Sequence, residues 1–313
     1  MKERFNGLVI RSTGGLFEVM PEEPSRGNLL CRARGALRRE EGRVLVGDRV
    51  AVLREEEGRR GETVIDSILP RKNALIRPPL ANLDCLYAVL AVTDPAPILE
   101  TTDKLLAIME KEGISAKVVI TKTDLGASLA AELAEIYKKA GYAVFPVSSH
   151  TDEGLAELSA DVTATLSGGH AAAFSGASGV GKSSLINALF PALALETGGI
   201  SQKIGRGKNT TRHAALYPVF GDASGGFLAD TPGFSMLDFL RFDFMTAEDL
   251  PHVFREMTPY LDRCRYGDCS HVKEEDCAVR LAVEQGIIPR SRYESFVSLY
   301  EVLKGKNLYG GNK

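Results

Sequence analysis

The 313-residue sequence lacks the signatures of a membrane-spanning or secreted chain. No apolar run approaches the roughly 18 to 20 residues that a membrane span needs. The opening stretch, MKERFNGLVI, lacks the long apolar segment before a small-residue cleavage site that marks a signal peptide. We therefore expect a cytoplasmic protein with no membrane partner.

Cysteine is scarce, and in a reducing compartment the five thiols are not expected to form a disulfide framework. Cys31 and Cys85 lie in apolar stretches, which predicts buried core side chains rather than reactive thiols. The other three, Cys264, Cys269 and Cys277, lie within fourteen residues of one another. They form the candidate metal site.

The sequence also lacks a net positive charge, because 38 Lys and Arg against 41 Asp and Glu give -3. This excludes attraction of nucleic acid by an overall basic field, so RNA contact would need a local patch. Residues 30–43 form such a patch, which could neutralise phosphates or could simply be a solvated face. Its basic members are Arg32, Arg34, Arg38, Arg39 and Arg43.

Three segments with different residue patterns follow one another along the chain and predict a multidomain protein. Residues 1–72 read as short strand-like runs between Gly-, Pro- and charge-rich turns, which predicts an RNA-binding β-barrel of the OB type, or an SH3-like barrel. Residues 73–245 alternate apolar strands with helix-like segments, as in an α/β domain with a parallel sheet. Residues 246–313 hold the Cys/His cluster and helical segments, which predicts a small helical zinc-binding domain.

Individual elements can be predicted within these segments. In the first domain, RVLVGDRVAVL at 43–53 is taken as one strand. In the second, DCLYAVLAV, KVVITKTD, YAVFPVSS and HAAAFSGASG are typical of strands, and LYPVFGDASGGFLADTPG of two strands joined by a Gly-rich hairpin. ASLAAELAEIYKKAG has helical spacing, with Lys138 and Lys139 in its last turn and Gly141 as a suitable C-terminal cap.

The strongest local signal is GASGVGKS, which matches the phosphate-loop pattern G-x-x-x-x-G-K-[ST] between an apolar strand and a helical run. That setting argues against a chance Gly-rich turn. Glycines let backbone N–H groups curl around phosphates, and the positive end of the following helix points at the same anion. We expect Lys182 to reach the β- and γ-phosphates and Ser183 to hold Mg²⁺. The loop residues are Gly176, Ala177, Ser178, Gly179, Val180, Gly181, Lys182, Ser183 and Ser184.

TKTD, which follows the apolar VVI, resembles the guanine motif N-K-x-D. The carboxylate of Asp124 would accept the N1–H and N2 amino protons of guanine, donors that adenine lacks. Lys122 would pack along the base, whereas a helix N-cap Asp is the alternative interpretation of the motif. The expected base-binding residues are Thr121, Lys122, Thr123 and Asp124, with Ser148 and Ser149 from VSSHTDEGL.

Two further segments resemble the switches of a GTPase. DTPGF supplies Asp230, which would support Mg²⁺ from a strand end, and Gly233, whose backbone would sense the γ-phosphate. GGISQKIGRGKNTTRHA is the candidate switch I, in which Thr211, favoured over Thr210, would coordinate Mg²⁺ when GTP is bound. The same loop could instead be a disordered basic linker.

The base motifs precede the phosphate loop, whereas a conventional GTPase has the phosphate loop and switches first. Closing the ends of a domain and reopening it elsewhere preserves its contacts when the termini are adjacent. We therefore expect a circularly permuted P-loop GTPase domain. Switch II would then lead directly into the C-terminal domain, so that nucleotide state could be transmitted as a domain displacement.

A Cys/His cluster with the spacing C-x4-C-x-H-x5-C is consistent with tetrahedral Zn²⁺. Four protein ligands leave no open coordination position, so the zinc should be structural. The last ligand would enter the helix CAVRLAVEQG, and free thiols are the alternative. The ligands are Cys264, Cys269, His271 and Cys277.

In their order, TKTD, GASGVGKSS, GRGKNTTRH, DTPGF and CRYGDCSHVKEEDCAV resemble the RsgA (YjeQ) family of circularly permuted bacterial GTPases over essentially the whole chain. The resemblance implies an N-terminal OB domain, a permuted GTPase domain and a C-terminal zinc domain, with ribosomal RNA contacted by the outer domains. It implies slow GTP hydrolysis that the small (30S) ribosomal subunit stimulates during its late maturation. We expect the protein to be a monomer.

The sequence departs from this pattern at three positions. Thr121 replaces the usual Asn, whose amide braces the base site against the phosphate loop, so base affinity should change while Asp124 retains selectivity. Asn209 replaces a His before the switch I threonines, with His213 as a candidate substitute, and Phe234 stands where Ras-like enzymes carry a water-orienting Gln. We therefore expect partner-assisted hydrolysis. A GTP-gated rRNA-binding module with negligible hydrolysis is the alternative. An ATP-dependent kinase or remodelling enzyme would leave TKTD and the switch-like motifs unexplained.

Overall fold

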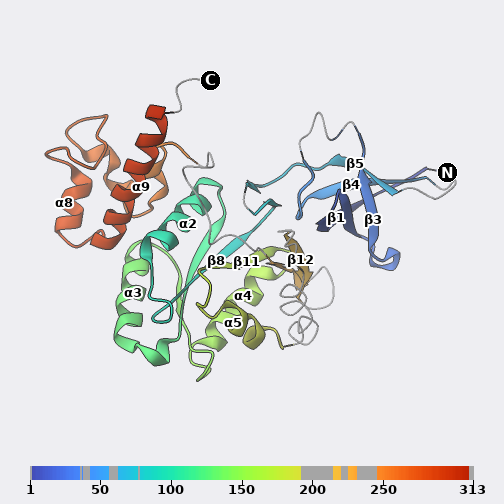
Figure 1. Ribbon diagram of the computed structural model, residues 1–313, viewed down its shortest axis with the longest axis horizontal. Coiled ribbons are helices and arrows are strands. Elements are labelled where there is room, and N and C mark those ends of the chain that lie inside the picture. The colour runs from blue at the N-terminus through green and yellow to red at the C-terminus, as the bar shows by residue number, and fades with distance from the viewer. Residues whose placement is uncertain are drawn as a thin grey trace. The chain divides into compact units, whose positions relative to one another are not determined.

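The structure is a computed structural model that describes residues 2–35, 37, 43–55, 63–76, 78–191, 214–219, 225–230 and 245–309 (Figure 1). The chain forms two compact units. Unit 1 comprises Met1–Cys85, Val162–Phe174 and Phe190–Phe234, and unit 2 comprises Leu86–Asp161, Ser175–Leu189 and Ser235–Lys313. Within the described ranges, no helix is both long and apolar enough to cross a membrane.

Unit 1 begins with the predicted β-barrel. Its strands are β1 (Lys2–Thr13), β2 (Leu16–Pro21), β3 (Leu29–Ala33), β4 (Arg49–Glu55) and β5 (Thr63–Ile68), with a 3-10 turn, η1 (Pro24–Arg26), between β2 and β3. β1 pairs antiparallel with β2 and β4, β2 with β3, and β4 with β5, whereas β3 and β5 are parallel. The pairings therefore close a five-stranded ring in the order β1-β2-β3-β5-β4, as expected of an OB-type Greek-key barrel.

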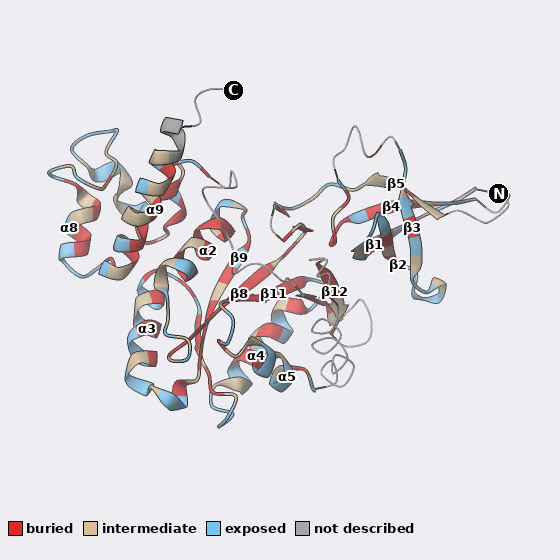
Figure 2. Cartoon of the chain, in the orientation of Figure 1, coloured by how far each residue is buried: buried red, intermediate tan, exposed pale blue. Residues whose placement is uncertain are grey.

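The barrel interior is filled mainly by aliphatic side chains. Buried residues are coloured red in Figure 2. Val9, Val19, Val50 and Ile65 have no exposed surface, and they pack around the equally buried Cys31. The expectation that Cys31 belongs to the core is confirmed. Burial raises the pKa of its thiol to about 11, so the thiol stays protonated at neutral pH.

The run at 43–53 is not one strand, and the expectation that it would be is wrong. β4 begins only at Arg49 because Gly47 turns the chain at φ +89°, where a Cβ would lie 2.0 Å from the carbonyl oxygen of Ala81. The buried carboxylate of Asp48 accepts the N–H of Leu45 at 2.7 Å and two guanidinium bonds from Arg71 at 2.6 and 2.8 Å. These distant contacts fix a turn that the local pattern of apolar residues does not reveal.

The rest of unit 1 is a short sheet that continues from the barrel. β12 (Ala215–Pro218) and β13 (Phe227–Asp230) are antiparallel, which agrees with the two strands predicted in this segment, and β11 (Ala171–Ser175) runs parallel to β13. β1 meets β12 at one pair of residues, Arg11 and Ala215. β6 (Ala74–Leu75) and β7 (Leu80–Ala81) form a separate antiparallel pair.

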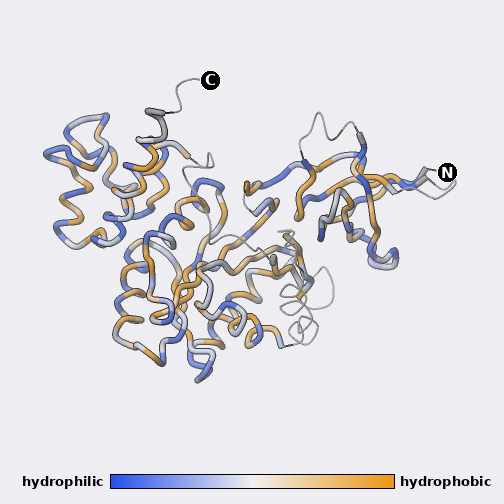
Figure 3. Tube along the Cα trace, in the orientation of Figure 1, coloured by the Kyte–Doolittle hydropathy of each residue, from blue (hydrophilic) through white to orange (hydrophobic). Residues whose placement is uncertain are grey.

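Unit 2 contains the strands β8 (Cys85–Ala91), β9 (Ser115–Thr121) and β10 (Val144–Pro146), in the order β10-β9-β8 with β9 and β10 parallel. All seven residues of β8 are buried, as expected of a strand covered on both faces. Its sequence, CLYAVLA, is apolar except for Tyr87, and Figure 3 colours the chain by this hydropathy. The helices of the central region are α2 (Leu99–Lys111), η2 (Thr123–Leu125), α3 (Ala127–Lys139), α4 (Leu155–Leu166) and α5 (Lys182–Leu189). α3 confirms the predicted helix, and Gly141 follows it at φ +84°.

The C-terminal part of unit 2 is helical, as predicted. It comprises η5 (Leu250–Val253), η6 (Thr258–Arg263), α8 (Ala278–Glu284) and α9 (Arg290–Tyr309). α9 packs against α2, and Arg292 of α9 bonds Asp103 of α2 at 2.7 Å and Glu256 at 2.6 Å. All three side chains are almost completely buried, so a buried ion triad joins this C-terminal region to α2.

Candidate nucleotide site and metal centre

The candidate phosphate loop joins β11 to α5, which gives it the strand–loop–helix setting that its sequence predicts. Lys182 opens α5, and its Nζ donates to the carbonyl oxygens of Gly176 and Ala177 at 2.8 and 2.7 Å. Partial burial lowers the pKa of this ammonium. Ser183 and Ser184 are exposed in the first turn of α5, where the helix dipole favours an anion.

Glycine is required at specific points of the loop. A Cβ on Gly176 would lie 2.0 Å from the carbonyl oxygen of Val89 in β8, so no side chain fits there. Gly179 and Gly181 have φ of +84° and +92°, a backbone region that L side chains rarely adopt. Ala177 is half-buried, Ser178 is exposed and Val180 is buried. The loop curvature needed for anion binding is therefore built from these glycines.

The candidate base motif begins at the end of β9 and continues into η2. Thr121 and Thr123 are buried, Lys122 is half-buried at φ +60°, and Asp124 is exposed. The N-cap of α3 is Gly126, so Asp124 does not have the N-cap role that was the alternative. Its carboxylate is accessible to a ligand.

Thr121 links the base motif to the phosphate loop. Its hydroxyl lies 2.6 Å from the carbonyl oxygen of Val180. Thr121 has no amide, but its hydroxyl bonds the phosphate loop from the position where the family usually has Asn. The two motifs, which lie 59 residues apart in sequence, are in direct contact.

The loop after β8 bonds the base motif and lies beside the phosphate loop, an arrangement that the sequence did not predict. Lys122 Nζ donates to the carbonyl oxygen of Asp94. Pro95 Cδ lies 3.5 Å from the position that a Cβ on Gly179 would occupy. The only sequence signal for this loop is its turn-forming composition, D-P-A-P, which does not identify what it touches.

Ser148 and Ser149 differ in their surroundings. Ser148 is fully buried, and its Oγ accepts the N–H groups of His150 and Thr151 at 3.2 Å, so it shapes its own loop. Ser149 is half-exposed. The loop lies beside the base motif, because the N–H of Val147 donates to the carbonyl oxygen of Ile120 at 2.8 Å.

The expected switch residues are largely outside the described ranges. Asp230 ends β13, as predicted, but only its backbone is described. Thr211, Gly233 and the departures at Asn209 and Phe234 lie outside the described residues.

The four predicted metal ligands are brought together. Their ligand atoms all lie within 4.8 Å of one another, so the group could hold a metal ion. Cys264 Sγ lies 3.8 Å from Cys277 Sγ, and His271 Nδ1 lies 3.5 Å from each. Burial raises the pKa of Cys269 to about 12 and lowers that of His271, which keeps the imidazole in its neutral, ligating form. Cys277 is also the N-cap of α8, as expected.

The loop that carries these ligands is held by neighbouring side chains. Burial by itself would raise the pKa of Glu274, but hydrogen bonds from the Ser270 hydroxyl and from backbone N–H groups of the loop lower it to about 2. Tyr293 of α9 donates to the carbonyl oxygen of His271 at 2.9 Å, and Arg280 of α8 to that of Glu274 at 2.9 Å. The loop is therefore supported from both helices.

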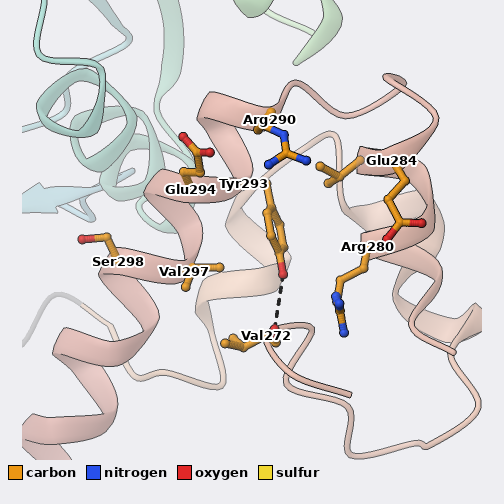
Figure 4. Close-up of a pocket in the computed structure, with 9 residues that line it drawn as sticks. Val272, Arg280, Glu284, Arg290, Tyr293, Glu294, Val297 and Ser298 are labelled. Carbon is orange, nitrogen blue, oxygen red and sulfur yellow. Dashed lines mark hydrogen bonds between the residues drawn. The ribbon is translucent and has the colours of Figure 1, made fainter. Parts of the chain in front are cut away.

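Tyr293 and Arg280 also line a pocket between α8 and α9 (Figure 4). The positive and negative charges that line the pocket are equal in number, since Arg280 and Arg290 line it together with Glu284 and Glu294. Val272, Val283 and Val297 supply its apolar wall. The balance of charge gives no reason to assign the pocket to a phosphate.

Among the basic residues at 30–43, Arg32, Arg34 and Arg43 are exposed. Arg34 pairs with Asp66 on β5, at 2.5 Å. Arg38 and Arg39 lie outside the described residues. Within the described part of this segment, the charges of Arg32 and Arg43 are therefore more accessible to an anionic ligand than that of Arg34.

Comparison with known proteins decides the family. A model of the RsgA GTPase matches residues 68–240, and a model of the RsgA N-terminal domain matches residues 6–61. The small ribosomal subunit biogenesis GTPase RsgA of Moorella thermoacetica is 42% identical over 299 residues, which cover 95% of this chain and 97% of that protein. The chain belongs to the RsgA GTPase family.

Solved structures agree with RsgA membership. YjeQ from Thermotoga maritima superposes with a TM-score of 0.77 at 34% identity, covering 97% of this chain and 99% of that chain. YloQ, described as a circularly permuted GTPase, superposes with a TM-score of 0.74 at 32% identity, covering 97% of this chain and 96% of that chain. In this RsgA-family GTPase the base motif likewise precedes the phosphate loop, and Thr121 joins the two. The permuted order therefore preserves the contact between the two motifs.

Proposed function

We propose that this chain is a GTP hydrolase that binds the small (30S) ribosomal subunit and its rRNA in the cytoplasm. It acts in late maturation of the subunit, and the subunit stimulates hydrolysis. Family membership supports the reaction class. The observation that carries the nucleotide assignment is the bond from the Thr121 hydroxyl to the phosphate loop, because it brings a guanine motif and an anion-binding loop into one site.

In this site each group has a distinct task. Asp124 accepts the N1–H and N2 protons of guanine, and Lys122 packs along the base. The N–H groups of residues 176–184 and the ammonium of Lys182 bind the phosphates. Ser149 belongs to the second base-contacting loop. The partial burial of Lys182 strengthens its attraction for a phosphate, because fewer water molecules compete.

Hydrolysis needs charge stabilisation and an oriented water. Ser183, Thr211 and Asp230 are the residues that would hold Mg²⁺, which supplies charge neutralisation at the phosphates, and Gly233 supplies a backbone donor. Phe234 and Asn209 offer no side chain that can act as a base toward water. The ribosomal subunit therefore orders the missing groups, and the free protein turns over slowly.

The four residues of the Cys/His cluster would hold one structural Zn²⁺. Zn–S bonds of about 2.3 Å and Zn–N bonds of about 2.0 Å give a tetrahedron with S–S edges of about 3.8 Å and S–N edges of about 3.5 Å. Among Cys264, His271 and Cys277, the Sγ–Sγ separation of 3.8 Å and the two Sγ–Nδ1 separations of 3.5 Å match those edges, and all four ligand atoms lie within 4.8 Å of one another. The ion would fasten the loop to α8 and add its binding energy to folding.

We further propose three domains, at 1–72, 73–245 and 246–313, in a monomer. The barrel and the zinc domain contact rRNA, and the arginines at 32 and 43 are the exposed charges that suit phosphates. Each phosphate contact of this kind makes binding weaker as salt rises.

The test is co-sedimentation of the protein with purified small and large subunits, with GTP, GDP or neither, while phosphate release is measured. We expect preferential binding to the small subunit with GTP and faster phosphate release there. Binding without any stimulated release would favour the alternative, a GTP-gated rRNA-binding module, which Phe234 and Asn209 motivate. Absence of both binding and stimulation would refute the proposed function.

A further inference from the structure

The first strand of the barrel changes its partner part-way along its length. β1 pairs with β4 over Lys2–Leu8, and the turn at Gly47 then takes the other chain away from β1. Val9 still exchanges backbone hydrogen bonds of 2.9 and 2.8 Å with this turn, but beyond it the edge of β1 has lost β4. An open strand edge presents N–H and C=O groups that need a partner. Here Arg11 of β1 pairs with Ala215 of β12.

The strand that takes this place, β12, lies between the two candidate switches. Ala215 directly follows the candidate switch I segment at 198–214, and β13, the other neighbour of β12, ends at Asp230, the first residue of DTPGF. All of these segments belong to unit 1. The barrel is therefore paired with a strand that begins where one candidate switch ends and lies beside the strand from which the other begins.

The register of the sheet places three residues in one row. Arg11 lies opposite Ala215, and Ala215 lies opposite Asp230. Because neighbouring strands lie about 4.8 Å apart, the backbone of Asp230 is about 10 Å from that of Arg11. The pairing of β1 thus supports the strand end that carries the candidate Mg²⁺ carboxylate.

The side chain of Arg11 strengthens this pairing. Its guanidinium carbon lies 5.9 Å from the centroid of the Tyr217 ring, a diagonal neighbour on β12. Nη1 of Arg11 also lies 3.6 Å from Oε2 of Glu18 on β2, so the guanidinium bridges the barrel and β12. A cation over an aromatic ring is attracted to it, but only weakly where water has access, and this side chain is 50% exposed. The link is therefore weak enough for a ligand of the barrel to change its strength.

We propose that the pairing of β1 with β12 couples the barrel to the GTP site. Contact of the small subunit with the barrel stabilises β12 between the candidate switches, and β12 in turn holds the end of β13. Tyr217 is then a positioning residue, which acts through β12 rather than on the nucleotide. The inference rests on the proposed function. Coupling is reciprocal, so GTP must strengthen subunit binding by the same factor as the subunit strengthens GTP binding.

The test compares Tyr217→Leu with Tyr217→Phe in the full-length protein. Leucine removes the ring beside Arg11, whereas phenylalanine keeps it. Phe5→Leu is the matched control, because the guanidinium carbon of Arg26 lies 5.0 Å from the centroid of the Phe5 ring, which is on β1 where that strand pairs with β4. For each protein, dissociation constants for the small subunit are measured with GDP and with a non-hydrolysable GTP analogue. Phosphate release with and without subunits and the melting temperature are also measured.

We expect Tyr217→Leu to reduce two quantities about threefold to tenfold: the preference of the subunit for the GTP-analogue form over the GDP form, and the stimulation of phosphate release. Release without subunits should stay within about twofold of the native rate. Tyr217→Phe and Phe5→Leu should keep both native values, because the ring beside Arg11 remains.

Native preference and native stimulation in folded Tyr217→Leu would overturn the inference, as would an equal loss in Phe5→Leu. If Tyr217→Leu does not fold, Arg11→Met removes the same contact from the side of β1, and native values in that variant overturn the inference equally. A native protein that neither binds the small subunit nor is stimulated by it would refute the proposed function itself.

Discussion

Replacing Arg292 by Met should strongly destabilise unit 2. The side chains of Arg292 and Asp103 are 1% exposed and that of Glu256 is 2% exposed, so the substitution leaves two buried carboxylates without a counter-charge. Removing one partner of a buried ion pair costs about 3–5 kcal/mol. With about 2–4 °C per kcal/mol for a unit of this size, the melting temperature should fall by on the order of 10 °C.

The matched control is Lys111→Met. Lys111 pairs with Asp249 at 2.7 Å and joins the same helix, α2, to the same C-terminal region, but these side chains are 37% and 32% exposed. An exposed pair contributes about 0–1 kcal/mol, because water screens it. Thermal and urea unfolding of the two variants and the native chain measure the difference. If Arg292→Met lost no more unfolding free energy than Lys111→Met, the reasoning would be refuted.

The pH dependence provides a second readout. Burial raises the pKa of Asp103 in the native protein, while the charge of Arg292 opposes that rise. Without Arg292 the pKa should rise further. A carboxyl whose folded-state pKa is raised contributes stability below its unfolded-state pKa and loses it as pH rises through the folded-state pKa. The loss of stability in Arg292→Met, relative to the native protein, should therefore be larger at pH 8 than at pH 5. A loss of stability that grows on acidification would contradict this account.

Three further substitutions test the two sites. Asp124→Ala should weaken GTP about 10-fold to 100-fold and leave ATP unchanged in competition binding, because charged hydrogen bonds to guanine are lost; an equal loss for both nucleotides would argue against base recognition. Gly176→Ala should abolish nucleotide binding, since its Cβ would lie 2.0 Å from the Val89 carbonyl, whereas Gly305→Ala, with nothing within 4 Å, should bind normally. Cys269→Ala should release the bound zinc and lower the stability of the C-terminal region, measured by elemental analysis and unfolding; unchanged metal content would refute the ligand assignment.

Much of the fold could be predicted because its signals are local. α3 follows from helical spacing with Gly141 beyond its end, and the strand–loop–helix around Gly176 follows from a short motif. The candidate metal ligands, from Cys264 to Cys277, are close in sequence, so one bent loop can bring them together. In each case neighbouring residues determine the backbone, and no distant contact is needed.

The family, the barrel, the order of the nucleotide motifs and the candidate metal ligands could all be predicted from local patterns in the sequence. The connections between these parts depend on tertiary contacts. The bond from Thr121 to Val180 spans 59 residues, that from Arg292 to Asp103 spans 189, and the turn at Gly47 is enforced by Ala81. Such contacts depend on which segments the fold places side by side, and a local pattern of residues does not encode that placement.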